Sequence, residues 1–145
     1  MTTYSKRVYL ASGFFNPFQL EAVAIAEDHL RGEGFDVFSP REHQHPELEF
    51  GSKEWREVTF DNDIDHIVKS DFVFAILDND MDEGVLMEIG YAYAIGRPIV
   101  ILDLSSKTIN LMVSDSLTAY LSSWDDVKHY DFEKLRHVPY TGEVI

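Results

Sequence analysis

The 145-residue sequence predicts an α/β fold with about five mostly parallel strands flanked by helices. Short apolar runs alternate with longer amphipathic segments, which is typical of a parallel sheet with right-handed crossovers. Two runs, 72–77 and 98–104, are almost entirely apolar, as expected of central strands that helices cover on both faces. Together these features favour a flavodoxin-like, doubly wound sheet. Ligands of such sheets bind beyond the carboxyl ends of the strands.

Apolar spacing and turn residues give the individual elements. Strands are predicted at 7–11, 35–38, 72–77 and 98–104, with an edge strand at 118–121. Helices are predicted from a cap at Asn16 to the glycines at 32 and 34, over 53–69, over 84–95, and from a capping box at 123–126. Residues 41–52 are expected to form an ordered surface loop, 109–117 a short separate segment, and 138–145 an extended tail. Without a repeat or linker, residues 1–145 are expected to form a single domain.

The composition restricts the partners. The chain has 26 acidic and 12 basic residues and a formal charge of −14, so phosphate backbones and anionic membrane surfaces are disfavoured. The lack of cysteine excludes disulfides, thiolate metal sites and a cysteine nucleophile. No apolar run is long enough to cross a bilayer, and the polar stretch 1–6 does not resemble a signal peptide. We therefore expect a cytoplasmic protein that acts on small molecules or other proteins.

Glu88 is the most unusual residue. It lies in an apolar helix one turn after its start, between Met87 and Ile89. A carboxylate there is costly to bury unless it is hydrogen-bonded or functional, and Gly84 leaves space above it on the same face. Asp82 alone would be a helix cap, but with Glu88 it forms a carboxylate pair at the carboxyl edge of a central strand. A solvated or capping role for Glu88 is the alternative.

Further candidates lie at the same predicted edge. The helix at 53–69 carries a cluster of three acids, Asp61, Asp63 and Asp65. One of them is expected to face the cleft, and a solvated face is the alternative for the others. Tyr9, in the first strand, is expected in the core with a satisfied hydroxyl. Phe14 and Phe15 suggest a stacking platform, with core or oligomer contacts as alternatives.

The sequence contains no motif that predicts a metal or another cofactor. His43 and His45, with Glu42 and Glu47 nearby, match no standard zinc spacing. The sequence also lacks a Gly-x-Gly-x-x-Gly segment, a Walker loop and a Gly-x-Ser-x-Gly elbow. Dinucleotide, nucleoside triphosphate and serine-hydrolase functions are therefore disfavoured.

Four segments of the chain resemble the nucleoside 2-deoxyribosyltransferases. They are Tyr9-Leu-Ala-Ser-Gly-Phe-Phe15, Trp55 with Asp61-Asn-Asp63, Asp82-x-Gly-x-x-x-Glu88-Ile-Gly-Tyr-Ala92, and Ile109-Asn-Leu-Met112 with Ser114-Asp115. The Asp-Gly-Glu segment is shared with deoxynucleotide N-glycosidases of the same superfamily. The Asn-Leu-Met segment is what makes the resemblance specific for the transferases.

The resemblance implies a cofactor-free, ping-pong exchange of 2-deoxyribose between purine or pyrimidine bases in nucleoside salvage. Glu88 matches the nucleophile, Asp63 and Asp82 the acids that handle base protonation and sugar hydroxyls, and Tyr9 the residue that orients the nucleophile. The base-side pocket corresponds to Phe14, Phe15, Gln44 and Trp55. Asn110 and Met112 match residues lent to a neighbouring subunit, which implies a homo-oligomer, either a hexamer built as a trimer of dimers or a dimer. Some members end in a tyrosine, whereas this chain ends in Ile145.

Two other functions stay open at this point. A hydrolase would use the same Glu88 chemistry with water as acceptor, on deoxynucleosides or their monophosphates. No basic cluster lies near Phe14 or Asp82 in the sequence, so a nucleoside is favoured over a nucleotide. A receiver-like signalling module would need acids directly after the first strand, where the sequence reads Ala11-Ser-Gly-Phe14.

Overall fold

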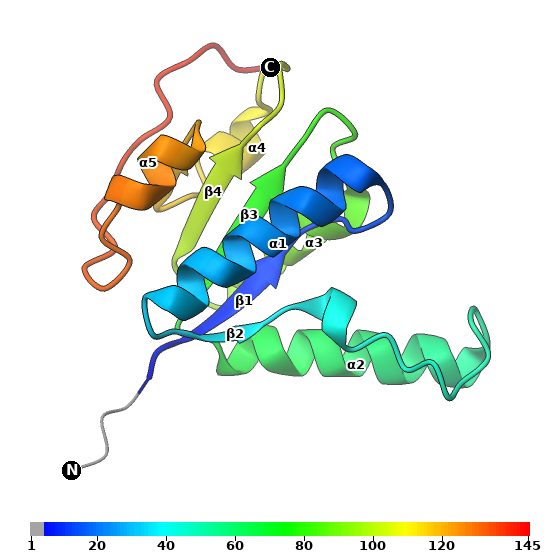
Figure 1. Cartoon of the computed structure of the whole chain (residues 1–145). Helices are drawn as coiled ribbons and strands as arrows, with labels where there is room; N and C mark the ends of the chain where they lie inside the picture. Colours follow the sequence, from blue (N-terminus) through cyan, green and yellow to red (C-terminus); the bar gives the residue numbers. More distant parts are fainter. Residues whose placement is uncertain (1–4) are drawn as a thin grey trace.

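Five parallel strands form the centre of the computed structural model, which describes residues 5–145 (Figure 1). The strands are β1 (Arg7–Ala11), β2 (Asp36–Phe38), β3 (Phe72–Leu77), β4 (Ile99–Asp103) and β5 (Ala119–Leu121). Their order in the sheet is β2-β1-β3-β4-β5. This arrangement confirms the predicted doubly wound α/β fold. The first four residues of the polar stretch 1–6 lie outside the described residues.

Helices cover both faces of the sheet. They are α1 (Pro17–Gly32), the 3₁₀ turn η1 (Pro40–Glu42), α2 (Lys53–Lys69), α3 (Glu83–Ala94), α4 (Leu111–Ser114) and α5 (Trp124–His129). Apolar residues of α1 and α5 form one buried cluster with alternate strand residues. Residues of α2, α3 and α4 form the other cluster, on the face that carries Tyr9 and Val73. The alternation of side chains along each strand therefore divides the core into two layers.

Local capping explains most of the helix boundaries. The Asn16 side chain accepts a hydrogen bond from the Gln19 amide, as predicted for the start of α1. The Gln19 side chain accepts from the Phe15 amide at 2.9 Å, whereas in a capping box it would bond to the amide of the cap, Asn16. Helix α3 begins one residue before the predicted start, directly after its cap, Asp82. These differences concern only the ends of elements.

The chain segments that follow the strands gather at one edge of the sheet. Because all five strands are parallel, the segments after β1, β2 and β3 leave from the same edge. The segment after β2 is long and contains η1, whereas 138–145 is extended and forms isolated bridges at Val138 and Val144. Within residues 5–145 no helix is long and apolar enough to span a membrane.

Candidate active site

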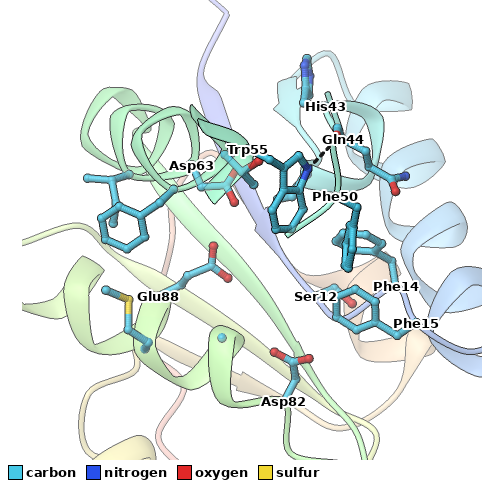
Figure 2. Close-up of a pocket in the computed structure, with 16 residues that line it drawn as sticks. Ser12, Phe14, Phe15, His43, Gln44, Phe50, Trp55, Asp63, Asp82 and Glu88 are labelled. Carbon is cyan, nitrogen blue, oxygen red and sulfur yellow. Dashed lines mark hydrogen bonds between the residues drawn. The ribbon is translucent and has the colours of Figure 1, made fainter. Parts of the chain in front are cut away.

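A pocket of about 630 Å³ opens where the segments after β1, β2 and β3 meet helices α2 and α3 (Figure 2). Most of the predicted site residues line it, namely Phe14, Phe15, Gln44, Trp55, Asp63, Asp82 and Glu88. In Figure 2 Asp63 and Glu88 lie on one side, Phe14, Phe15 and Phe50 gather on the other, and Asp82 lies between the two groups at the bottom of the view. The pocket thus has an acidic part and an aromatic part.

Glu88 projects into the acidic part from the second turn of α3. Its Oε2 accepts a hydrogen bond from the hydroxyl of Tyr9, which is fully buried in β1. Burial raises the pKa of Glu88 to about 8, and the charges of Asp63 and Asp82 act in the same direction. The hydrogen bond from Tyr9 opposes this increase because it favours the ionised carboxylate. Burial, with the charge of Glu88, also raises the pKa of Tyr9, which therefore stays a hydrogen-bond donor.

Asp63 and Asp82 face the same space from different helices. Burial raises the pKa of Asp63 to about 6, although His66 and His45 partly oppose the increase. Asp82 is also the N-cap of α3, since its Oδ1 accepts from the Val85 amide at 3.0 Å. Of the three acids in the α2 cluster, Asp63 lines the pocket with Glu88. Asp65 instead pairs with Lys69 at 2.7 Å, and Asp61 is exposed.

Aromatic rings form the other part of the pocket. Phe14 and Phe15 have ring centroids 4.5 Å apart, and Phe50 and Trp55 have centroids 4.6 Å apart. Phe15 is 72% exposed and Phe50 84% exposed, so apolar ring faces remain open at the mouth. Flat apolar rings suit a flat heteroaromatic ligand. The arrangement can therefore hold an aromatic base beside a group of acids.

Several lining residues are not among the residues that the sequence predicts for the site. They are Ser12, Pro40, His43, Phe50, Thr59, Phe60, Ile64 and Met87. Gly84, which was expected to leave space beside Glu88, also lines the pocket. Thr59 could have been found, because it lies one helical turn from both Trp55 and Asp63 on α2. His43 stacks on Phe38 with centroids 4.5 Å apart. Among residues 5–145 no group of three or more acids and histidines is arranged to hold a metal ion.

Asn110 and Met112 do not line this pocket. The Asn110 side chain caps α4 by accepting from the Met112 amide at 2.9 Å, and Met112 is 74% exposed. Their predicted role at a neighbouring subunit remains a prediction.

The parallel sheet and its acidic pocket at the carboxyl edge are typical of an enzyme that acts on a small molecule. The family model described as nucleoside 2-deoxyribosyltransferase matches residues 8–120. The chain belongs to this family of enzymes, as its resemblance predicted.

Individual relatives agree with this assignment. A nucleoside deoxyribosyltransferase of Limosilactobacillus fermentum is 32% identical, with coverage of 87% of this chain and 86% of the relative. One from Lactobacillus leichmannii is 28% identical, with coverage of 96% and 98%. The structure of a 2-deoxyribosyltransferase from Bacillus psychrosaccharolyticus is 48% identical, with a TM-score of 0.89 and coverage of 93% and 99%. The CMP N-glycosidase of Clostridium botulinum shares the fold, at 20% identity, a TM-score of 0.62 and coverage of 86% and 95%.

Proposed function

We propose that this enzyme exchanges 2-deoxyribose between purine or pyrimidine bases through a covalent deoxyribosyl-Glu88 intermediate. The observation that carries the proposal is the Glu88 carboxylate, which lies in the pocket, accepts a hydrogen bond from Tyr9 and has Asp63 and Asp82 nearby. The substrates are deoxynucleosides and free nucleobases, and the role is nucleoside salvage in the cytoplasm.

The first half-reaction breaks the glycosidic bond. As the bond between C1 of the sugar and the base nitrogen lengthens, its electron pair moves to the base and positive charge grows on the sugar ring. A Glu88 oxygen then bonds to C1, and the base leaves after it has received a proton. In the second half-reaction a nitrogen of the acceptor base attacks C1, Glu88 leaves as a carboxylate, and the acceptor's proton returns to the acids. Two displacements at C1 retain the configuration.

The proton that the leaving base receives comes from acids whose pKa values are raised. Burial raises the pKa of both Asp63 and Glu88, so near neutral pH these acids hold a proton between them. Positive charge on the sugar favours ionised Glu88, so the proton then resides on Asp63. Asp82 is already engaged as the helix cap through Oδ1. We therefore assign base protonation to Asp63 and binding of sugar hydroxyls to Asp82.

The aromatic part of the pocket binds the base. Phe14, Phe15 and Trp55 offer ring faces, and Gln44 offers hydrogen bonds to the edge of the base. Asn110 and Met112 are proposed to complete the pocket of a neighbouring subunit in a homo-oligomer. Met112 and the end of the chain are exposed, as such a contact requires.

Mass spectrometry of the quenched enzyme tests the covalent step. A 2-fluoro-2-deoxy nucleoside donor slows breakdown of the intermediate because the fluorine destabilises positive charge on the sugar. The adduct is expected on the peptide that carries Glu88 and is expected to be absent from Glu88→Gln. An adduct on Asp63 or Asp82 would overturn the assignment.

A hydrolase that uses the same glutamate is the second candidate, because the exposed mouth at Phe15 and Phe50 gives water access to the pocket. Incubation of deoxyadenosine with and without free thymine separates the two. A transferase forms thymidine only when thymine is present. Release of deoxyribose at the same rate in both reactions would identify a hydrolase.

A further inference from the structure

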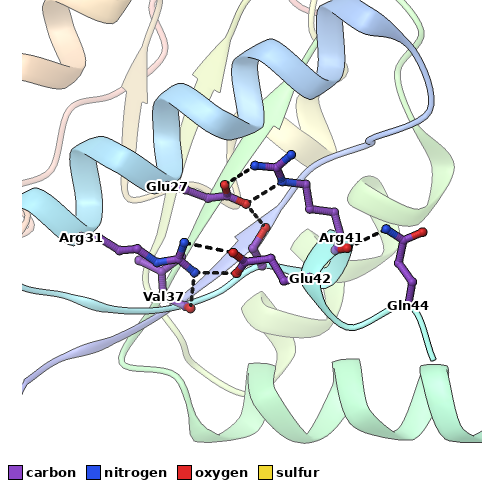
Figure 3. Close-up of polar contacts among 7 residues, drawn as sticks. Glu27, Arg31, Val37, Arg41, Glu42 and Gln44 are labelled. Atoms are coloured by element: carbon purple, nitrogen blue, oxygen red, sulfur yellow. Dashed lines mark hydrogen bonds and ion pairs between the residues drawn. The ribbon is translucent and has the colours of Figure 1, made fainter. Parts of the chain in front are cut away.

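An ion pair between a buried glutamate and a half-buried arginine joins helix α1 to the segment after β2 (Figure 3). Glu27 of α1 is only 3% exposed. Its carboxylate accepts hydrogen bonds from the Ser39 hydroxyl at 2.6 Å, from Arg41 Nε at 2.8 Å, and from Arg41 Nη2. Three donors, two of them from a bidentate guanidinium group, compensate the carboxylate for its burial.

The Glu27–Arg41 pair is charged when the enzyme works. Burial alone would raise the pKa of Glu27, but the hydrogen bonds from Arg41 and Ser39 outweigh it and hold the pKa below its ordinary value. The same carboxylate raises the pKa of Arg41. Neither partner takes part in the proposed reaction, and neither lines the pocket. The pair is therefore expected to act through the residues that it holds in place.

A chain of hydrogen bonds leads from the pair to the pocket. The Arg41 carbonyl accepts from Gln44 Nε2 at 2.6 Å, and the Gln44 carbonyl accepts from Trp55 Nε1 at 3.1 Å. Both Gln44 and Trp55 line the pocket on its base side. Because Nε2 of Gln44 donates to the Arg41 carbonyl, Oε1 of the same side-chain amide remains available to accept a hydrogen bond from a ligand.

The segment that carries Gln44 needs such an anchor. Between β2 and α2 its regular structure is the single turn η1, and the backbone hydrogen bonds there are short-range, such as those from the Glu42 amide to the Ser39 carbonyl and from the His43 amide to the Pro40 carbonyl. His43 and Gln44 are exposed. A polar segment of this kind is held in one conformation mainly by its links to the rest of the protein. Glu27 holds it at both Ser39 and Arg41.

We propose that Glu27 and Arg41 are positioning residues that fix Gln44 and Trp55 at the base side of the pocket. The part of this inference that concerns enzyme activity rests on the proposed function. It assigns the pair an effect on base binding and not on bond breaking. Loss of the pair therefore weakens substrate binding while the chemistry at Glu88 continues.

A second ion pair provides the matched control. Arg31 of α1 binds Glu42 of η1 with an Nη2–Oε1 distance of 2.5 Å, and also donates to the Val37 carbonyl at 3.3 Å. This pair joins the same two elements but is more exposed, with side chains 42% and 37% accessible. Among the described residues, no side-chain hydrogen bond of Arg31 or Glu42 reaches Gln44. Glu42→Gln thus removes an ion pair without breaking the chain of bonds to the pocket.

The first test needs no substrate. The chain has two tryptophans, so Trp124→Phe leaves Trp55 as the only indole. In that background Glu27→Gln and Arg41→Lys should increase acrylamide quenching of Trp55 about twofold because the segment opens more often. Glu42→Gln should leave quenching unchanged. Arg41→Lys keeps the positive charge and serves if Glu27→Gln folds poorly. Unchanged quenching in both Glu27→Gln and Arg41→Lys would overturn the proposal.

The second test is a double-mutant cycle with Gln44→Ala. In the otherwise unchanged enzyme, Glu27→Gln should raise KM for the deoxynucleoside about three- to tenfold and change kcat less than about twofold. In the Gln44→Ala background the same substitution should have little further effect on KM, because the group that it positions is gone. An equal increase in both backgrounds would show a merely structural role. If the unmodified enzyme exchanges no bases, the proposed function fails, and the quenching test still decides this inference.

Discussion

The Tyr9 hydroxyl donates a hydrogen bond to Oε2 of Glu88, and this bond joins strand β1 to helix α3 across 79 residues of sequence. Tyr9 is fully buried and stacks on Phe38 at 5.6 Å, so its ring has little freedom to move. The bond therefore fixes the direction of the half-buried Glu88 carboxylate and offsets part of its loss of contact with water.

Tyr9→Phe should lower kcat about 10- to 100-fold, because the carboxylate loses the donor that orients it and favours its ionised form. The same loss should move the pKa of Glu88 further upward, since the Tyr9 hydrogen bond lowers it. The measurements are kcat and the pH dependence of kcat/KM. Tyr130→Phe, which removes a hydroxyl that donates to the Arg136 carbonyl away from the pocket, is the control and should leave both unchanged. Full activity in Tyr9→Phe would contradict an orienting role.

The shared proton predicts a bell-shaped pH dependence of kcat/KM. The limbs should lie near the two raised pKa values of the coupled acids, about 6 for Asp63 and about 8 for Glu88. At low pH both groups are protonated and no carboxylate attacks. At high pH both are ionised and no acid protonates the base. Asp65→Asn, which changes an exposed acid paired with Lys69, should leave the profile unchanged. A flat profile from pH 5 to 9 would argue against the shared proton.

Glu88→Gln should stabilise the fold at alkaline pH. The folded pKa of Glu88, about 8, lies above its ordinary value of 4.5, so the folded protein keeps the proton longer than the unfolded chain. The free energy of unfolding therefore falls as the pH rises through this window, and the amide removes that loss. Differential scanning calorimetry should show Tm higher than that of the unmodified enzyme by roughly 3–10 °C at pH 8.5. At pH 4 the two should agree. An equal difference at both pH values would contradict the linkage.

Two substitutions separate the roles of Asp82. Asp82→Ala removes the cap of α3 and should lower the free energy of unfolding by about 1 kcal/mol, whereas Asp82→Asn keeps an acceptor for the Val85 amide. Both should reduce kcat/KM. The reduction should be smaller than in Glu88→Gln, because Asp82 positions the sugar but forms no covalent bond to it. Ser123→Ala, which removes the cap of α5, should cost similar stability without loss of rate. Normal turnover in Asp82→Asn would limit Asp82 to capping.

Subunit mixing tests the proposed shared site. Glu88→Ala and Asn110→Asp are each expected to be inactive, and the aspartate still offers an oxygen to the amide at the start of α4. Mixed oligomers should regain activity, because some pockets then combine an intact Glu88 with an intact Asn110 from a neighbour. Activity of the mixture is compared with that of each variant alone. No recovery after proven subunit exchange would place the whole site within one chain.

Local sequence patterns were sufficient to predict most of the fold. Strands at Arg7–Ala11 and Phe72–Leu77 and the helix at Lys53–Lys69 have the predicted bounds, because apolar periodicity and caps act over a few residues. The parallel direction of the strands follows from the alternation of strands and helices. Helix α3 begins at Glu83, one residue before the predicted Gly84, because Asp82 is its cap and the residue after a cap is the first of the helix.

The pocket was harder to predict where it is formed by irregular chain. Glu88 lies on a helix, where spacing shows which side chains share a face. Spacing left open which of the three acids of α2 faces the pocket, and the family resemblance indicated Asp63. Phe50 and His43 lie in the polar segment 41–52, which has no periodicity and so gives no side-chain direction. The Glu27–Arg41 pair joins residues 14 apart across a reversal of the chain, and no local pattern marks it.

The pocket draws Asp63 and Glu88 from regular elements, Asp82 from the cap directly before α3, and much of its base side from connecting segments. Asp63 and Glu88 belong to helices α2 and α3, whereas Phe14, Gln44 and Phe50 lie between elements. Connecting segments tolerate changes of sequence and length far better than packed helices do. The range of accepted bases can therefore diversify, in evolution or by grafting of 43–51 between relatives, while the machinery that handles the sugar stays the same.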